Sequence, residues 1–184
     1  MCNLRQPVAA LIALGLYGCL GATSSFVPDG EAILDPRLLG TWTDSASHER
    51  AVITPAGSHS YAILYTDGQG RTVSFIGVLG RGPDNFILDV QPPADALGGY
   101  RDYAVRLHIP VVLDGIGPRI RVSVLEPDSL DRYLRDQPRA LAHLRIGDQL
   151  ALTADTPTLW QFVTTYIRRT GALTTPSTWI RRSS

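Results

Sequence analysis

Apolar and polar residues alternate through much of residues 36–125, with the period of two that is typical of β-strands buried on one face. The clearest case is a pair of runs, 60–66 and 71–79, on either side of the turn residues Asp67 to Gly70. Such runs around a Gly-containing turn predict a β-hairpin. Comparable runs follow one another with short connections, at 38–43, 50–55, 86–90, 103–113 and 119–125. This pattern restricts most of the chain to neighbouring antiparallel strands.

Two helical segments interrupt the strands in the second half of the sequence. Asp128 is placed to cap a helix that ends before Pro138, and Thr156 is placed to cap a second helix whose first position is Pro157. Shorter strands are predicted between and after these helices, at 141–146, 149–153 and 178–181. The sequence therefore predicts a mainly β fold with two short helices, either a small antiparallel β-barrel or an open two-sheet sandwich.

The composition excludes several classes of function. The 17 basic residues are all Arg, and 17 acidic residues balance them. The chain therefore offers neither a basic surface for nucleic acid nor a polybasic patch for membranes. With 44% hydrophobic and 18% charged residues, it has enough apolar side chains to bury a core and is not expected to be disordered. No nucleic-acid partner and no cofactor are predicted.

Residues 1–18 have the parts of a bacterial export signal. A short head with one positive charge precedes an apolar run of ten residues at 8–17. A run of that length is too short to cross a bilayer, which takes about 20 residues. The segment from Leu16 to Cys19 then resembles the lipobox of bacterial lipoproteins, although Tyr17 is larger than the residue usual at its position.

The lipobox resemblance implies cleavage between Gly18 and Cys19 and a diacylglyceryl group on the Cys19 thiol. Two alternatives remain: ordinary signal cleavage after Ala22 or Ser24, which would discard Cys19, and an uncleaved anchor. The other cysteine of the chain, Cys2, would leave with the signal peptide. The exported domain would therefore hold no intrachain disulfide and would depend on its core alone.

The same resemblance implies a cellular location and a domain organisation. Inner-membrane lipoproteins commonly carry Asp after the lipidated cysteine, whereas this chain carries Leu20. This favours the outer membrane, with the domain facing the periplasm. We expect a signal peptide at 1–18, a lipidated N-terminus and tether at 19–35, and a single β-rich domain at 36–184. The membrane is the predicted partner, through the lipid at Cys19.

The G-T-W sequence that ends at Trp42 resembles the G-x-W opening of lipocalins and other calycins. This resemblance implies a calycin- or lipocalin-like barrel in which the Trp closes one end and a late Arg packs over it. The candidates for that Arg are Arg168, Arg181 and Arg182. The sequence departs from the family in lacking the T-D-Y motif between the sixth and seventh strands, in having an extra helix at 128–136, and in lacking a cysteine pair.

Most of residues 36–182 are also similar to a loose group of uncharacterised bacterial lipoproteins. The shared features are the G-T-W strand, the Y-T-D-x-x-G turn at 65–70, a central Leu-rich helix, and a closing strand and helix that begin at Leu152 and include Phe162. The resemblance implies an exported lipoprotein, and it implies no activity.

Residues that could support catalysis or bind a metal show no recognisable pattern. The four histidines, His48, His59, His108 and His143, lack the i, i+4 or H-x-H spacing of metal sites. No G-x-S-x-G nucleophile motif occurs. His108 is expected on the solvated outer face of a strand. The sequence therefore predicts no catalytic and no metal-binding residue, and we expect a protein that is not an enzyme.

Five aromatic residues are candidates for lining a ligand cavity inside a barrel: Tyr61, Tyr65, Phe75, Phe86 and Tyr103. We predict a membrane-anchored, non-enzymatic domain of the cell envelope that binds a partner protein or a small apolar ligand. One alternative is a structural or inhibitory interaction module whose barrel is filled by its own side chains. The other is an envelope hydrolase, which would need a histidine beside a Ser or a carboxylate in a cleft.

Overall fold

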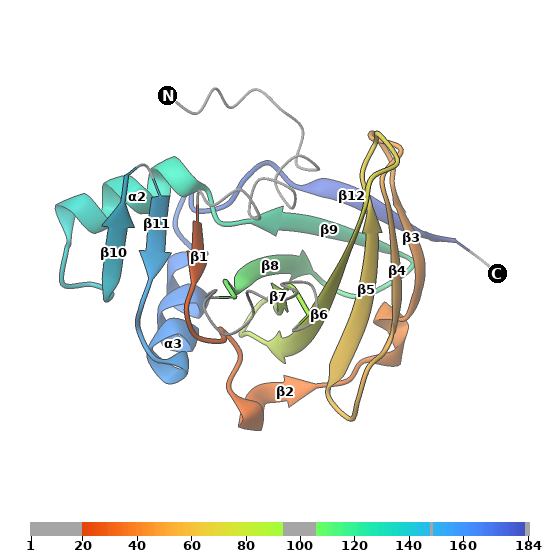
Figure 1. The fold of residues 1–184 in the computed structure, drawn as a ribbon, viewed down its shortest axis with the longest axis horizontal. Helices are drawn as coiled ribbons and strands as arrows, with labels where there is room; N and C mark the ends of the chain where they lie inside the picture. Colours follow the sequence, from red (N-terminus) through yellow and green to blue (C-terminus); the bar gives the residue numbers. More distant parts are fainter. Residues whose placement is uncertain (1–19, 94–105, 148, 183–184) are drawn as a thin grey trace, which may run out of the picture.

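A computed structural model describes residues 20–93, 106–147 and 149–182. Eight antiparallel strands form a closed β-barrel, and two short α-helices and a three-stranded sheet pack against its outside (Figure 1). The prediction of a mainly β fold built as a small antiparallel barrel is confirmed. The alternative of an open two-sheet sandwich is wrong, because the large sheet closes on itself.

Seven of the barrel strands follow one another as a meander, each paired with the next: β3 (Gly40–Asp44), β4 (Arg50–Pro55), β5 (Ser60–Thr66), β6 (Thr72–Arg81), β7 (Phe86–Gln91), β8 (Ile109–Asp114) and β9 (Arg119–Val124). The eighth, β12 (Ser177–Arg182), pairs with both β9 and β3. The barrel is therefore closed by a strand that the helices separate from the meander in sequence.

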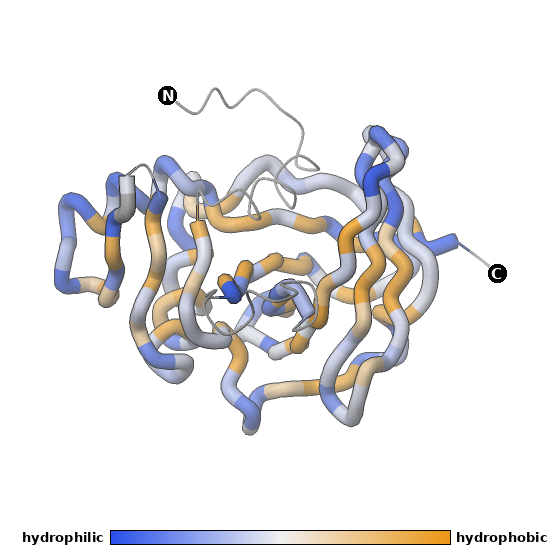
Figure 2. The backbone as a smooth tube through the Cα atoms, in the orientation of Figure 1, coloured by the Kyte–Doolittle hydropathy of each residue, from blue (hydrophilic) through white to orange (hydrophobic). Residues whose placement is uncertain are grey.

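The alternation in the sequence sends every second side chain into the barrel. Along β5, Ile63 and Tyr65 are buried, whereas Leu64 points outward and is 45% exposed. The predicted β5–β6 hairpin is confirmed. Its turn is held by Asp67, whose Oδ1 accepts hydrogen bonds of 2.9 Å from two backbone N–H groups of the turn. Figure 2 shows hydrophobic residues along the barrel strands and hydrophilic ones at this turn.

A second hydrophobic core lies outside the barrel. It is built by two helices and a sheet of strand order β1-β11-β10: α2 (Pro127–Asp136), α3 (Thr156–Tyr166), β1 (Leu20–Ala22), β10 (His143–Ile146) and β11 (Gln149–Leu152). Leu134 and Leu159 are fully buried there. Ile87 of β7 and Val112 of β8 belong to the same cluster, so the helices and the small sheet cover the outer face of these two barrel strands.

Both predicted helices are present, but their caps differ from the prediction. Asp155, not Thr156, caps α3, and its carboxylate accepts a hydrogen bond of 3.0 Å from a backbone N–H in the first turn. Helix α2 begins at Pro127, and its N-cap Glu126 makes no side-chain cap hydrogen bond, so Asp128 lies inside the first turn. A carboxylate there still favours the helix, because it faces the positive end of the helix dipole.

The N-terminal segment 20–35, predicted to be a tether, is part of the folded domain, and that prediction is wrong. Ala22 exchanges two backbone hydrogen bonds of 2.9 Å with His108, and Phe26 is fully buried. The segment passes in order through β1, the 3-10 turn η1 (Asp29–Glu31) and β2 (Ala32–Ile33), and it leads into the 3-10 turn η2 (Pro36–Leu38). Its buried residues fall in two short groups, 20–22 and 26–27, so no periodicity marked them. Cys19 lies outside the described residues, and its cleavage and lipidation stay predictions.

Candidate functional site

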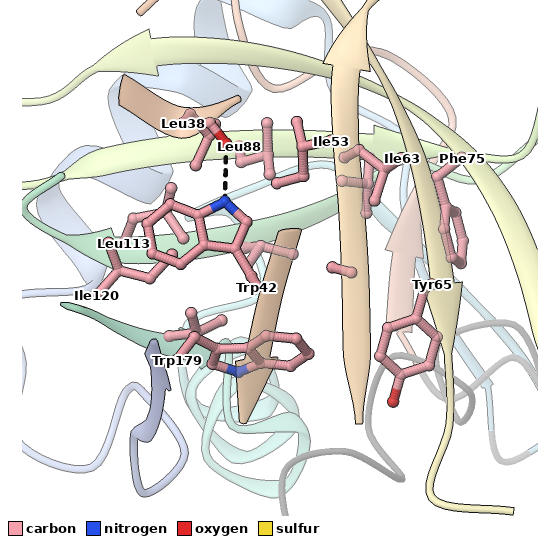
Figure 3. A pocket seen from close by; sticks show the side chains of 14 residues that line it. Leu38, Trp42, Ile53, Ile63, Tyr65, Phe75, Leu88, Leu113, Ile120 and Trp179 are labelled. Atoms are coloured by element: carbon pink, nitrogen blue, oxygen red, sulfur yellow. Dashed lines mark hydrogen bonds between the residues drawn. The ribbon is translucent and has the colours of Figure 1, made fainter. Parts of the chain in front are cut away.

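The barrel encloses a cavity of about 70 Å³. Ligand pockets typically measure roughly 300–1,000 Å³, so this one is small. Its exposed lining is apolar, and side chains from all eight barrel strands contribute to it (Figure 3). Packing is close beside it, because a Cβ at Gly77 would lie 2.9 Å from Ile63 Cδ1 and 3.0 Å from Leu88 Cδ1. The barrel is therefore mainly filled by its own side chains.

Two of the five predicted lining residues, Tyr65 and Phe75, contribute to the cavity wall. Figure 3 shows both rings beside each other on neighbouring strands. Tyr65 also contacts Trp179, with ring centroids 6.4 Å apart. Together with Trp42, these rings supply the aromatic part of the cavity wall.

The other three predicted residues lie elsewhere. Tyr61 is fully buried in the barrel core but does not line the cavity, and its hydroxyl accepts a hydrogen bond of 2.7 Å from the backbone N–H of Asp35. Phe86 is half-buried, with the Arg81 guanidinium 5.7 Å from its ring centroid. Tyr103 lies outside the described residues.

Trp42 of the G-T-W sequence is 1% exposed, and its Nε1 donates a hydrogen bond of 2.8 Å to the Leu38 carbonyl (Figure 3). Arg181 is directly opposite Trp42 in the β3–β12 register. Its guanidinium lies against Gly40, where a Cβ would be 3.2 Å from Arg181 Nε. Of the three candidate arginines, Arg181 is the one on the same face of the sheet as Trp42 and directly paired with it.

One end of the barrel collects carboxyl groups near the Tyr65 hydroxyl. Glu49 is 4% exposed. Burial raises the pKa of Glu49, the negative charges of Asp44 and Asp67 raise it further, and a hydrogen bond with Tyr65 acts in the opposite direction. Burial also raises the pKa of Asp67, but hydrogen bonds from Arg71 outweigh it and hold that pKa below its usual value. The cluster therefore contains one carboxyl whose pKa is raised and one whose pKa is lowered.

A second polar cluster, missed by the sequence analysis, lies on the outside of the barrel. Asp89 is 2% exposed, and its Oδ2 accepts three hydrogen bonds: from Ser25 Oγ at 2.6 Å, from the Phe26 N–H at 3.1 Å, and from His108 Nδ1 at 2.9 Å. The His108 side chain is only 13% exposed. The prediction that His108 lies on a solvated face is wrong, because the N-terminal segment covers this part of β7.

The arrangement of the Asp89 cluster differs from that of a serine hydrolase. In a hydrolase the serine contacts the imidazole and the carboxylate contacts the other ring nitrogen. Here Ser25 and His108 both contact the carboxylate, and no Ser–His hydrogen bond occurs among the described residues. Asp89 instead joins the N-terminal segment to the barrel.

The remaining histidines show no shared site. His48 and His59 are exposed, and His143 Nδ1 is 2.8 Å from the Leu141 carbonyl oxygen. Within the part of the chain that the structure describes, no three His, Cys, Asp or Glu side chains are grouped so that they could hold a metal ion.

An aromatic groove lies between α2 and α3, also outside the barrel. Tyr133, Phe162 and Tyr166 form it, with ring centroids 5.2 to 6.1 Å apart. The Arg169 guanidinium lies 4.7 Å from the Tyr133 ring centroid, a cation–π geometry. The groove has a volume of about 280 Å³, four times that of the barrel cavity. No periodicity or motif marked it, because its rings come from two helices that are distant in sequence.

Searches against protein-family models, curated proteins and solved structures each find no match to this chain. No helix formed by residues 20–93, 106–147 or 149–182 is long and apolar enough to span a membrane.

Proposed function

We propose that the protein is a lipid-anchored protein of the bacterial cell envelope whose barrel domain is a non-enzymatic interaction module. The observation that carries the proposal is the burial of β1 immediately after Cys19. Leu20 is 8% exposed and Ala22 is fully buried. Cleavage before Cys19 leaves β1 in the exported protein, whereas cleavage after Ala22 or Ser24 would remove a strand of the second core. The fold therefore supports lipobox processing over the alternative signal cleavage.

A lipidated Cys19 would supply enough membrane affinity by itself. A diacylglyceryl group carries two acyl chains, and each buried CH₂ contributes about 0.8 kcal/mol. Stable attachment then needs no membrane-spanning helix. Leu20, in place of the Asp that commonly retains lipoproteins at the inner membrane, supports the outer membrane as the destination, with the domain in the periplasm.

The small cavity supports an interaction module over a carrier of a large ligand. A ligand inside the barrel would have to be a small apolar group, because about 70 Å³ is available and the exposed lining is apolar. The hydrolase alternative has less support, because the Asp89 carboxylate holds both Ser25 and His108 and leaves no serine hydrogen-bonded to the imidazole among the described residues.

Replacing Cys19 tests the anchor. In the host cell, Cys19→Ser should abolish incorporation of labelled fatty acid and move the protein from the membrane to the soluble envelope fraction, because the thioether cannot form. Cys2→Ser is the matched control. It also removes a thiol from the signal region, and it should leave lipid labelling and membrane recovery unchanged.

Continued membrane recovery of Cys19→Ser, together with unchanged labelling, would show that the protein is not held by a lipid on Cys19. Loss of labelling in both variants would show that the signal region as a whole is sensitive to substitution and that the lipobox assignment has no specific support.

A further inference from the structure

We propose that the outer face of the β1-β11-β10 sheet lies on the surface of the membrane that holds the anchor. This inference rests on the proposed lipidation of Cys19 and adds an orientation to it. β1 starts at Leu20, and Cys19 is the preceding residue, so one Cα–Cα step of about 3.8 Å separates the acylated residue from the folded domain. Because no spacer intervenes, the end of the sheet at Leu20 must stay close to the lipid headgroups.

The strand register decides which side chains face outward there. Leu20 and Ala22 point into the second core. Gly21, between them, is paired with Ala151 of β11, and Ala151 is paired with Leu144 of β10. Directly paired residues share one face of a sheet. Gly21, Ala151 and Leu144 therefore form a row across the face opposite the second core.

This row is apolar, although it faces away from both cores. Leu144 is 58% exposed, the most exposed large hydrophobic side chain that the structure describes. Leu107 covers Gly21, since a Cβ on Gly21 would lie 2.8 Å from Leu107 Cβ. Ala151 and Leu107 are half-buried. A solvated sheet face normally carries polar side chains. Three apolar side chains on this face are therefore unusual for a surface in water. They are here called the outer row: Leu107, which lies over Gly21, and Ala151 and Leu144.

The outer row is within reach of the bilayer. Two strand spacings of about 4.8 Å and one residue step of about 3.3 Å place the Leu144 Cα about 10 Å from the Cα of Leu20, the residue bonded to Cys19. Figure 1 shows β1, β10, β11 and α2 together on one side of the barrel. Apolar side chains at an interface insert about 5–10 Å into the headgroup region. The acyl chains of the proposed anchor insert into the bilayer. The bilayer is therefore the partner that we expect to contact the outer row.

Site-directed spin labelling of the lipidated protein tests the orientation. After processing, Cys2 is gone and Cys19 is a thioether, so an introduced cysteine is the one free thiol. A nitroxide at Leu144→Cys is compared with one at Leu64→Cys, in vesicles of phosphatidylethanolamine and phosphatidylglycerol. Leu64 is the matched control, because it is a 45% exposed leucine on β5, on the opposite side of the barrel from β10 (Figure 1).

We expect the label at residue 144 to be several-fold more accessible to oxygen, relative to a water-soluble nickel chelate, than the label at residue 64. A spacer of about ten Gly and Ser residues between Cys19 and Leu20 should reduce this difference, because it frees the domain from the surface. Equal accessibility at the two positions in vesicle-bound protein would overturn the orientation and leave the anchor intact. Failure of the protein to float with the vesicles would overturn the anchor itself, and the orientation with it.

Discussion

At the scale of single residues, Glu49 is the side chain whose environment most directly links the fold to pH. Burial and nearby negative charges raise its pKa above the ordinary value of 4.5. The folded chain therefore keeps a proton on Glu49 in a pH window where the unfolded chain has lost it. The free energy of unfolding then falls as the pH rises from 4.5 through the raised pKa, and it is constant with respect to this group on either side of the window.

Glu49→Gln should raise the free energy of unfolding at pH 7 by about 1 kcal/mol or more, because it removes a buried charge that has one oxygen without a hydrogen-bond partner among the described residues. The gain should disappear below the ordinary pKa of 4.5, where the carboxyl is neutral in both states. Urea denaturation at the two pH values measures both effects.

Asp67→Asn is the matched control for Glu49→Gln, and it has the opposite expected sign. The pKa of Asp67 is lowered in the folded chain, so its charged form stabilises the fold above its ordinary pKa, and the amide should destabilise the protein at pH 7. A loss of stability in Glu49→Gln at pH 7 would show that this carboxyl is ionised and favourably bound in the folded protein.

At the scale of elements, period-two alternation predicted the β5–β6 hairpin and other strands of the meander, because one face of such a strand lies in the barrel and the other faces solvent. Alternation predicted exposure wrongly where another segment covers the outer face of a strand. Asp89 is at an outward position of β7, and alternation alone predicts that it is exposed. Its 2% exposure results from the N-terminal segment that packs over it. The closure of β12 against β3 is a long-range pairing that no local pattern marks.

The candidate sites were only partly predictable for the same reason. Tyr65 and Phe75 could be placed in the barrel interior from their positions in alternating runs. The aromatic groove needed the packing of α2 against α3, and the Asp89 cluster needed the contact between Ser25 and β7. Both depend on tertiary contacts between distant segments, which composition and spacing do not encode.

Removal of residues 20–24, the five residues that follow the lipobox, should unfold part of the protein. A chain that begins at Ser25 lacks β1, and it loses the burial of Leu20 and the pairing of Ala22 with His108. Compared with a chain that begins at Leu20, both made without a leader, its free energy of unfolding should be lower by at least about 2 kcal/mol. Equal urea midpoints for the two chains would show that β1 contributes nothing to the fold.

At the scale of the whole molecule, we propose that an export signal and a lipid anchor at Cys19 precede the barrel domain, with no spacer before the first strand at Leu20. The barrel supplies a rigid, mainly filled body, and the second core fixes β1 and the Asp89 cluster against one side of it. In this proposal the anchor would set the orientation of the domain as well as its location, because it would determine which side faces the bilayer.

The most direct test is mass spectrometry of the N-terminal peptide of protein purified from its native membrane. Trypsin cuts after Arg, and the first Arg beyond the lipobox is Arg37. The account predicts a peptide that spans residues 19–37 and carries a diacylglyceryl group on Cys19. An unmodified N-terminus at Thr23 or Ser25 would contradict it, because the exported protein would then have neither the lipid nor β1.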